Sequence, residues 1–378
     1  MANDSKYKVL VDTLKSAILS GKYDLDRPFP SERMLIRKYG HSRITVQHAL
    51  RELERLGFVS RQQGRGTFIT KQGASRKIGL IVPGVAYSEY FSQIVSEIAR
   101  LADKAEYMLL LGDMSSPKVA DRARKAKKFA VELVKENVAG VIYQPFEFIP
   151  NADSINRRIV SILDNAGIPV VLLDYDIEPA PERSKFDIVG INNMDAGYRL
   201  GNHLLSLGVR KIHFLLRPNS APSGRNRIRG VITAINLWGG KPCKYATLEA
   251  SPDDLSALNR HLRHGKPDAF VCFGDITAAI FKKTLEKAGL QVPQDVLLSG
   301  FNDLQIASLL TPPLTTIHQP SAQMAQLAFK RLLERIAEPE MPPLEMYLPA
   351  PLVVRASTRR VKPVKKGGRK PTTKRLRK

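Results

Sequence analysis

The spacing of apolar residues predicts three helices within the first sixty positions. One apolar face defines a helix over residues 7–19, and it is formed by Leu10, Leu14, Ala17 and Ile18. Two shorter helices follow, each with a serine as its N-cap and a glycine at its end. The first runs from Ser31 to Gly40 and the second from Ser42 to Gly57. Two short helices joined by a tight turn are typical of a helix-turn-helix.

Two short strands are predicted directly after these helices. They cover residues 58–61 and 67–70, and the hairpin tip between them contains Gly64, Arg65 and Gly66. Such a wing can place an arginine along a DNA groove. The outer face of the preceding helix carries side chains that bond phosphates or base edges, namely Arg43, Thr45, Gln47, His48 and Arg51. On a single charged helix such residues are more often only a solvated face, and it is their combination with the other predicted elements that favours DNA binding.

The pattern changes after residue 77. Apolar, β-branched runs occur at 78–82, 108–111, 140–143, 170–173, 188–191, 212–216, 269–273 and 296–299. Helical stretches such as 91–105, 120–136 and 276–288 lie between them. Continuous apolar strands alternating with helices predict parallel sheets that are covered on both faces. About 280 residues of this kind suit two doubly wound lobes, with a ligand crevice at the carboxyl ends of the strands.

Composition agrees with a folded protein of more than one domain. The chain has 378 residues, of which 43% are hydrophobic and 25% charged, and a single core rarely grows beyond about 250–300 residues. Its two cysteines, Cys243 and Cys272, form no CxxC pair, which argues against a disulfide framework or a structural zinc site. The polar N-terminus and the absence of a long apolar run favour a cytoplasmic protein without a membrane segment.

The formal net charge of +23 is concentrated at the two ends of the chain. Residues 1–71 contain fourteen Lys/Arg and seven Asp/Glu, whereas residues 356–378 contain eleven Lys/Arg and no acidic residue. The middle of the chain keeps only +5. A basic region suits an anionic partner such as nucleic acid, and the near-neutral middle does not need one.

Several local motifs of the first seventy residues together resemble the winged helix-turn-helix of GntR regulators. They are Pro30-Ser31-Glu32-Arg33, Ser42-Arg43-Ile44-Thr45-Val46, Ala49-Leu50, Leu53, Leu56-Gly57 and Gly64-Arg65-Gly66-Thr67. The resemblance implies DNA contacts from Arg33, Ser42, Arg43, Thr45, Gln47, His48, Arg65, Gly66 and Thr67. Gln47 departs from the arginine common at its position, which changes the expected base preference because glutamine pairs with adenine.

The region 78–357 resembles the effector domain of LacI-type repressors. The motifs are Asn192-Asn193 with Asp195-Ala196-Gly197, Phe273-Gly274-Asp275, Leu298-Ser299-Gly300-Phe301-Asn302-Asp303 and Thr311-Pro312-Pro313-Leu314-Thr315-Thr316-Ile317. The resemblance implies two lobes joined by three crossovers that close on a ligand. The combination is similar to arabinose-responsive repressors.

By the same resemblance, an effector would contact Tyr87, Tyr90, Phe91, Gln144, Asp174, Arg227, Asp275 and Asn302. Carboxylates, amides and an arginine fork suit a sugar or sugar derivative, and an aromatic ring suits its apolar face. Tyr90 and Phe91 can equally be core residues, and Asp275 can equally cap a helix. Two positions depart from the family: Gly274 stands where many relatives have asparagine, and Asn302 where many have aspartate.

The predicted organisation is an α+β winged helix-turn-helix at 1–71, a linker at 72–77, an α/β two-lobed, periplasmic-binding-protein-like domain with parallel sheets at 78–357, and a basic tail at 358–378. We call the first domain the reader and the second the sensor. The tail has no apolar periodicity and is expected to be disordered. It suits a nonspecific phosphate-binding arm or a solubilising extension, and its Gly368-Arg369-Lys370-Pro371 segment weakly resembles a minor-groove hook.

The favoured function is therefore a transcription regulator, a repressor in the first instance, that binds a pseudo-palindromic operator as a homodimer and responds to an effector. No cofactor or metal is expected. A P-loop, GxGxxG, GxSxG or HExxH motif is absent from the sequence, which argues against the corresponding enzymes. A sugar-binding protein and an architectural DNA-binding protein remain as alternatives.

Overall fold

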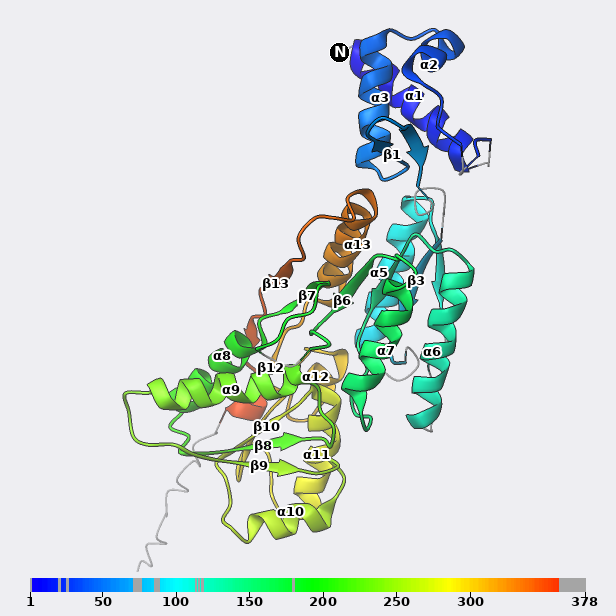
Figure 1. Cartoon of the computed structure of the whole chain (residues 1–378). Helices are drawn as coiled ribbons and strands as arrows, with labels where there is room; N and C mark the ends of the chain where they lie inside the picture. The colour runs from blue at the N-terminus through cyan, green and yellow to red at the C-terminus, as the bar shows by residue number, and fades with distance from the viewer. Residues whose placement is uncertain are drawn as a thin grey trace, which may run out of the picture.

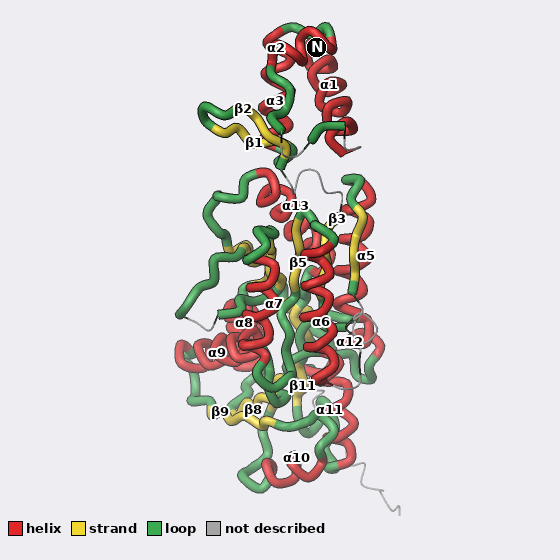
Figure 2. The backbone as a smooth tube through the Cα atoms, turned by 45° about the vertical axis from the view of Figure 1, so that its right-hand side comes forward, coloured by secondary structure: helices red, strands yellow, loops and turns green. Residues whose placement is uncertain are grey.

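The computed structural model describes residues 2–19, 22–24, 27–70, 77–84, 89–112, 114, 116, 119–178 and 181–359. It consists of a small N-terminal domain, followed by two α/β lobes that lie one below the other (Figures 1 and 2). The predicted fold class, a winged helix-turn-helix followed by a two-lobed α/β domain with parallel sheets, is confirmed.

The reader contains three helices and a two-stranded hairpin. They are α1 (Ala2–Leu19), α2 (Glu32–Tyr39), α3 (Arg43–Arg55), β1 (Val59–Gln62) and β2 (Gly66–Ile69). Both predicted N-caps form, because the hydroxyl oxygens of Ser31 and Ser42 accept the backbone N–H groups of Met34 and Thr45. Helix α1 begins five residues earlier than the apolar pattern predicted. Those residues are mostly polar and carry no periodic signal.

The first lobe of the sensor is built on a six-stranded parallel sheet of order β13-β7-β6-β5-β3-β4. Its strands are β3 (Lys77–Ile81), β4 (Met108–Leu111), β5 (Gly140–Tyr143), β6 (Val170–Leu173), β7 (Asp187–Ile191) and β13 (Glu345–Leu348). Helices α5 (Glu89–Lys104) and α13 (Ser321–Ala337) share one apolar cluster with the sheet. Helices α6 (Val119–Lys135) and α7 (Ala152–Asp164) belong to a second cluster.

The second lobe has a four-stranded parallel sheet of order β11-β10-β8-β9. Its strands are β8 (Lys211–Leu216), β9 (Lys244–Glu249), β10 (Ala269–Cys272) and β11 (Leu297–Ser299). The helices of this half are α8 (Asn193–Ser206), α9 (Pro222–Leu237), α10 (Leu255–Leu262), α11 (Asp275–Lys287) and α12 (Gln305–Leu309). Helices α10 and α11 pack in a separate apolar cluster of this lobe.

The chain passes between the lobes three times. It leaves the first lobe after β7, returns between β12 (Thr316–Ile317) and α13, and leaves again between β13 and β14 (Leu352–Val353). The last described element, η2 (Ala356–Thr358), lies against β11 in the second lobe. All strands of both main sheets run parallel, so their carboxyl ends lie along the crevice between the lobes.

Some expectations need correction. Strand β4 forms the edge of its sheet, and Met108 is 59% exposed, so this apolar run is not covered on both faces. Strands β9 and β13 were not predicted, because their side chains alternate between exposed and covered positions. Lys77, assigned to the linker, begins β3, and Thr358, assigned to the tail, is buried and bonded to Thr315.

Candidate functional site

Two of the exposed arginines that are predicted to contact DNA lie near the starts of α2 and α3. Arg33 lies on α2, and Arg43 is the first residue of α3. The guanidinium of Arg43 is 3.7 Å from the carboxylate of Glu32 and its side chain remains 76% exposed. Gln47 donates to the same carboxylate at 3.0 Å. Glu32 therefore orients two predicted contact residues while leaving Arg43 open to a phosphate or a base.

Other predicted contact residues have partners within the reader. The hydroxyls of Ser42 and Thr45 lie 2.9 Å apart, and Thr45 is only 6% exposed. This pair caps α3, so any DNA contact from Thr45 would have to share its hydroxyl. His48 is exposed and stacks on Tyr7 with ring centroids 4.1 Å apart.

The wing forms as predicted. Strands β1 and β2 are antiparallel, with Gln62 opposite Gly66. Gly64 and Gly66 have φ values of +76° and +111°, in the region that only glycine adopts readily. Arg65 and Gly66 are exposed at the tip, and Thr67 is half-buried.

One exposed residue of α3 was not selected from the sequence. Ile44 is 73% exposed directly beside Arg43, although it is apolar. An apolar side chain at the start of a recognition helix can contact a thymine methyl group. Its place just after the N-cap, outside the buried stripe of Val46, Leu50 and Leu53, was the available signal.

The predicted effector residues converge on one cavity between the lobes. It has a volume of about 380 Å³, within the range of small-molecule sites. Seven of the eight predicted residues line it: Tyr90, Phe91, Gln144, Asp174, Arg227, Asp275 and Asn302. Tyr87 lies outside the described residues.

Arg227 lies at the centre of this cavity's hydrogen-bond network. It is 3% exposed, and its Nε donates to the side-chain oxygen of Asn193 at 2.8 Å. Its two terminal nitrogens donate to the carbonyl of Phe273 at 2.8 Å and to Gln319 Oε1 at 3.4 Å. Within the described residues it forms no ion pair, and burial lowers its pKa. The buried positive charge is thus held by neutral acceptors.

Gln319 is the main site residue that the sequence reasoning missed. It is 4% exposed, and its side-chain nitrogen donates to Asp174 at 3.1 Å and to the Tyr90 hydroxyl at 3.2 Å. It also accepts a hydrogen bond from Arg227, so Gln319 contacts three predicted effector residues. It follows the Thr315-Thr316-Ile317 segment by two positions, and that proximity to a family motif was the only signal available.

Two carboxylates, those of Glu147 and Asp174, face the same space. Burial raises the pKa of Glu147 to about 8, with the neighbouring Asp174 adding to the shift. Burial also raises the pKa of Asp174, although Arg227 acts in the opposite direction. A ligand rich in hydroxyl groups can donate hydrogen bonds to both groups.

Asp275 is anchored within the fold. One oxygen accepts the Thr316 hydroxyl at 2.6 Å and the other accepts the backbone N–H of Leu304 at 2.8 Å. Burial raises its pKa to about 7. Asp275 is the first residue of α11, whose N-cap is Gly274. An effector contact from Asp275 stays a prediction beside this structural role.

Two side-chain oxygens in the cavity wall lack a protein partner. They are Gln144 Oε1 and Asn302 Oδ1. An unpaired buried acceptor costs free energy until a donor reaches it. At Gly274, a Cβ atom would meet its nearest neighbours only at 3.6–3.7 Å, so there is room where many relatives carry asparagine. These features leave space and acceptors for ligand hydroxyl groups.

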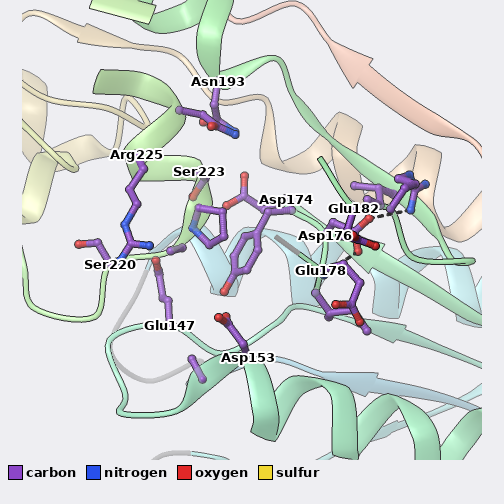
Figure 3. Close-up of a pocket in the computed structure, with 18 of the residues that line it drawn as sticks. Glu147, Asp153, Asp174, Asp176, Glu178, Glu182, Asn193, Ser220, Ser223 and Arg225 are labelled. Atoms are coloured by element: carbon purple, nitrogen blue, oxygen red, sulfur yellow. Dashed lines mark hydrogen bonds and ion pairs between the residues drawn. The ribbon is translucent and has the colours of Figure 1, made fainter. Parts of the chain in front are cut away.

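A larger cavity of 890 Å³ adjoins the first. Figure 3 shows its acidic wall, with Asp153, Asp176, Glu178 and Glu182 on one side and Arg225 on the other. Glu147 and Asp174 line both cavities. Of the predicted effector residues that the structure describes, only Asp174 is in the lining of the larger cavity, whereas the smaller cavity also has the Tyr90–Phe91 pair, whose ring centroids lie 5.3 Å apart.

The described part of the chain contains neither a candidate metal site nor a candidate membrane helix. No group of three or more His, Cys, Asp or Glu side chains there is arranged to hold a metal ion. No described helix combines the length and apolar character needed to cross a membrane.

Comparisons with known proteins agree with this geometry. Residues 6–69 match the bacterial regulatory proteins of the gntR family, and residues 202–358 match a periplasmic binding protein-like domain. The chain is a gntR-type reader joined to a periplasmic-binding-protein-like sensor. The resemblance found in the sequence is thereby confirmed.

The chain is similar to known regulators, as three examples show. The regulator is 27% identical over 371 residues to the arabinose metabolism transcriptional repressor of Geobacillus stearothermophilus, covering 94% of this chain and 98% of the relative. It is 25% identical to the transcriptional repressor PurR of Mannheimia succiniciproducens, covering 77% and 84%. A LacI-type regulator structure from Alkaliphilus metalliredigens, complexed with D-xylulofuranose, aligns with a TM-score of 0.60 at 25% identity, covering 75% and 99%. The predicted class, an effector-controlled DNA-binding repressor, is confirmed.

Proposed function

We propose that this regulator represses transcription from a pseudo-palindromic operator and that a sugar or sugar derivative in the 380 Å³ cavity controls its DNA affinity. The observation that carries the effector proposal is the convergence of Gln144, Asp174, Arg227 and Asn302 beside the Tyr90–Phe91 pair. Because its target is chromosomal DNA, we expect the protein to act in the cytoplasm without a cofactor or catalytic step.

The chemistry of the cavity supports a polyhydroxylated ligand. Hydroxyl groups can donate to the free oxygens of Gln144 and Asn302, and Phe91 offers a partly exposed ring for an apolar sugar face. Of the relatives above, one is named for arabinose metabolism and one holds D-xylulofuranose. These names support a pentose or a related sugar as the first class to test.

A thermal-shift screen tests the effector class. The probes are L-arabinose, D-xylulose, D-ribose, their phosphates, and purine bases as the contrasting class. A ligand at 100 times its dissociation constant adds about 2.7 kcal/mol of stability, so a true effector raises the melting temperature clearly. Stabilisation by purines alone would contradict the proposal, as would stabilisation that persists in a variant with the cavity residues Gln144 and Asn302 both replaced by leucine.

The DNA contacts proposed for the reader are those of Arg33, Ser42, Arg43, Thr45, Gln47, His48, Arg65, Gly66 and Thr67. Selection of duplexes from a random pool gives the operator sequence without knowledge of the genome. A pseudo-palindrome is expected because a dimer presents two readers. Selection of a single, asymmetric half-site would contradict that expectation.

A homodimer assembled through the sensor is part of the proposal. The edge strand β4 exposes Met108 and Leu111, and an apolar sheet edge is a natural surface for a second copy. Sedimentation of the wild type should give a dimer, and Met108→Asp should weaken it. A wild type that sediments as a monomer, both alone and on DNA, would contradict the dimer.

The tail lies outside the described residues beyond Arg359. We propose that residues 360–378 contact DNA phosphates without sequence preference. Deleting them should weaken binding to all duplexes similarly and flatten the dependence of affinity on salt. An unchanged salt slope would leave the solubilising role as the better explanation.

A further inference from the structure

The reader rests on the sensor at one close backbone contact. A Cβ atom on Gly57 would lie 2.5 Å from the carbonyl oxygen of Ile336 and 2.7 Å from the Cα of Ala337. Such distances leave no room for a side chain, so the two backbones touch directly. Figure 1 shows the same arrangement, with the upper end of α13 directly beneath β1, and Figure 2 agrees from a second direction.

Gly57 occupies a defined position in the reader. It follows Leu56, the C-cap of recognition helix α3, and its φ of +73° lies in the left-handed region. Its N–H donates to the carbonyl of Glu54, and the N–H of Phe58 donates to that of Leu53, which together end α3. A displacement of Gly57 therefore displaces the helix that carries Arg43 and Gln47.

The two surfaces also match in charge. Helix α13 presents its carboxyl end, where the backbone carbonyls carry partial negative charge. The last turn of α3 presents Arg55, and the charge of Glu338 helps to raise the pKa of Arg55, after the larger effect of Glu52. Arg55 of the reader and Glu338 of the sensor therefore carry opposite charges beside the contact.

The opposite end of α13 lies at the effector cavity. Gln319, two residues before the first residue of α13, bonds to Tyr90, Asp174 and Arg227. The backbone N–H of Ser321 donates to the carbonyl of Gln319, which ties the first turn of α13 to that network. The helix has 17 residues, so at about 1.5 Å per residue it spans roughly 25 Å from cavity to reader.

Helix α13 is held firmly along this length. Its last turns bear Arg331 and Arg335, whose guanidinium groups lie 2.8–2.9 Å from the carboxylate of the fully buried Asp187 on β7. Where it crosses β5, the Leu332 side chain would be only 2.7 Å from a Cβ on Gly140. A helix packed so closely moves as a unit and not by bending.

We propose that the carboxyl end of α13 is the docking surface for the reader of the same chain, and that effector occupancy reaches recognition helix α3 through the contact of Gly57 with Ile336 and Ala337. This coupling rests on the proposed function, because it assumes that the effector binds beside Gln319. In this proposal, Gln319 links α13 to the effector cavity, and Gly57 links the other end of α13 to the reader.

The chain offers a matched pair of variants to test the docking. Gly57 and Gly40 both follow reader helices with left-handed φ values, +73° and +69°, but a Cβ on Gly40 would meet nothing within 4 Å. Asparagine tolerates this backbone region better than other residues. Gly57→Asn should therefore disrupt the docking, whereas Gly40→Asn imposes the same local strain without touching the sensor.

The measurement is the distance between spin labels on the reader and the sensor in the full-length protein without DNA or effector. Labels are placed at the exposed positions Asp12 and Lys127, in a Cys243→Ser background and diluted with unlabelled chain. The wild type and Gly40→Asn should give one narrow distance distribution, and Gly57→Asn a broad one. Equal distributions for the two glycine variants would overturn the docking.

Ala337→Phe tests the same contact from the sensor side, and it decides the question if Gly57→Asn does not fold. It should broaden the distribution as Gly57→Asn does, and a narrow distribution would overturn the docking.

The coupling is tested by perturbing the cavity. Gln319→Ala removes the side chain that joins the cavity to α13, so it should shift or broaden the distance distribution in the wild-type background. In the Gly57→Asn background it should add no further change. A distribution identical to that of the wild type would overturn the coupling even if the docking is real. Because these measurements use neither DNA nor sugar, they separate failure of the coupling from failure of the proposed function.

Discussion

The reader and the sensor use the same residue types in opposite surroundings. In the reader, Arg43 is 76% exposed and lies 3.7 Å from its nearest acidic partner. In the sensor, Arg227 is 3% exposed and all three of its donor nitrogens are engaged. The reader thus keeps charge available for a large, solvated polyanion. The sensor has already desolvated its polar groups around a space for a small ligand, so these groups contribute to stability as well as to recognition.

This comparison predicts that breaking an ion pair has very different consequences in the two domains. In the sensor, Asp187 is fully buried between Arg331 and Arg335. Asp187→Asn leaves the largely buried guanidinium of Arg335 without a counter-charge and that of Arg331 with only Glu334, which should lower the free energy of unfolding of the sensor by about 3–5 kcal/mol. Scanning calorimetry of the full chain measures the loss in the transition of the larger domain.

The matched control lies in the reader. Glu52 pairs with Arg55 at 2.7 Å, but the Arg55 side chain is 63% exposed. Glu52→Gln should cost less than about 1 kcal/mol, because water and salt already screen such a pair. Similar losses for the two variants would remove the contrast between the domains.

The second prediction decides which cavity holds the effector. Arg227→Ala should weaken effector binding by roughly 1.5–3 kcal/mol, since it removes a charged donor from the wall of the 380 Å³ cavity. Arg225→Ala is the control, because Arg225 lies on the same helix but is exposed in the larger cavity. Isothermal titration with the sugar identified by thermal shift gives both affinities. Loss of affinity in Arg225→Ala alone would move the effector site to the larger cavity.

The third prediction concerns the reader alone. Arg43→Ala should cost on the order of 1–3 kcal/mol in operator affinity and relax the preference at one base pair if the contact is to a base. The fluorescence anisotropy of a labelled, selected duplex measures the loss, and effector binding should be unchanged. Arg199→Ala, which removes an exposed arginine of the sensor, provides the control. Equal losses in both variants would indicate a general charge effect.

The sequence pattern predicted those parts of the fold in which burial leaves a continuous apolar signal. Strand β5 is buried at every position, and its predicted and observed limits coincide. Strand β13 was missed because it alternates in exposure and joins β7 from more than 150 positions later in the chain. The pattern of neighbouring residues cannot show that a strand so distant in sequence pairs with β7 at the edge of the sheet.

The same limit applies to the functional residues. Arg227 and Asp174 were named because the family resemblance implied them as effector contacts, and both line the same cavity. Gln319 was missed because a single polar residue after a short strand has no periodicity. Gly57 was recognised as the end of a helix, but its contact with Ile336 depends on the placement of two domains, which no local pattern specifies.

The smallest predicted effect is a difference in the sign of pH dependence between the domains. Burial raises the pKa of Glu147 in the sensor from 4.5 to about 8, so between these values the folded sensor binds more protons than the unfolded chain. This group therefore makes the sensor less stable as the pH rises through that window. In the reader, the hydrogen bond from Arg55 lowers the pKa of Glu52, so its contribution is present above pH 4.5 and is lost as the pH falls through the folded-state pKa.

Glu147→Gln tests this difference, because glutamine has a similar shape but does not titrate. The melting temperature of the wild-type sensor should fall between pH 5.5 and 8.5 relative to that of the variant, by on the order of 2–4 °C, which corresponds to about 1 kcal/mol for a domain of this size. Calorimetry at several pH values resolves the two domains, and Glu182→Gln, which changes an exposed carboxylate of the larger cavity, is the control. If Glu147→Gln has the same pH profile as the wild type and as Glu182→Gln, Glu147 remains ionised and solvated in the folded sensor. Its carboxylate would then behave like the exposed charged groups of the reader, in spite of its burial.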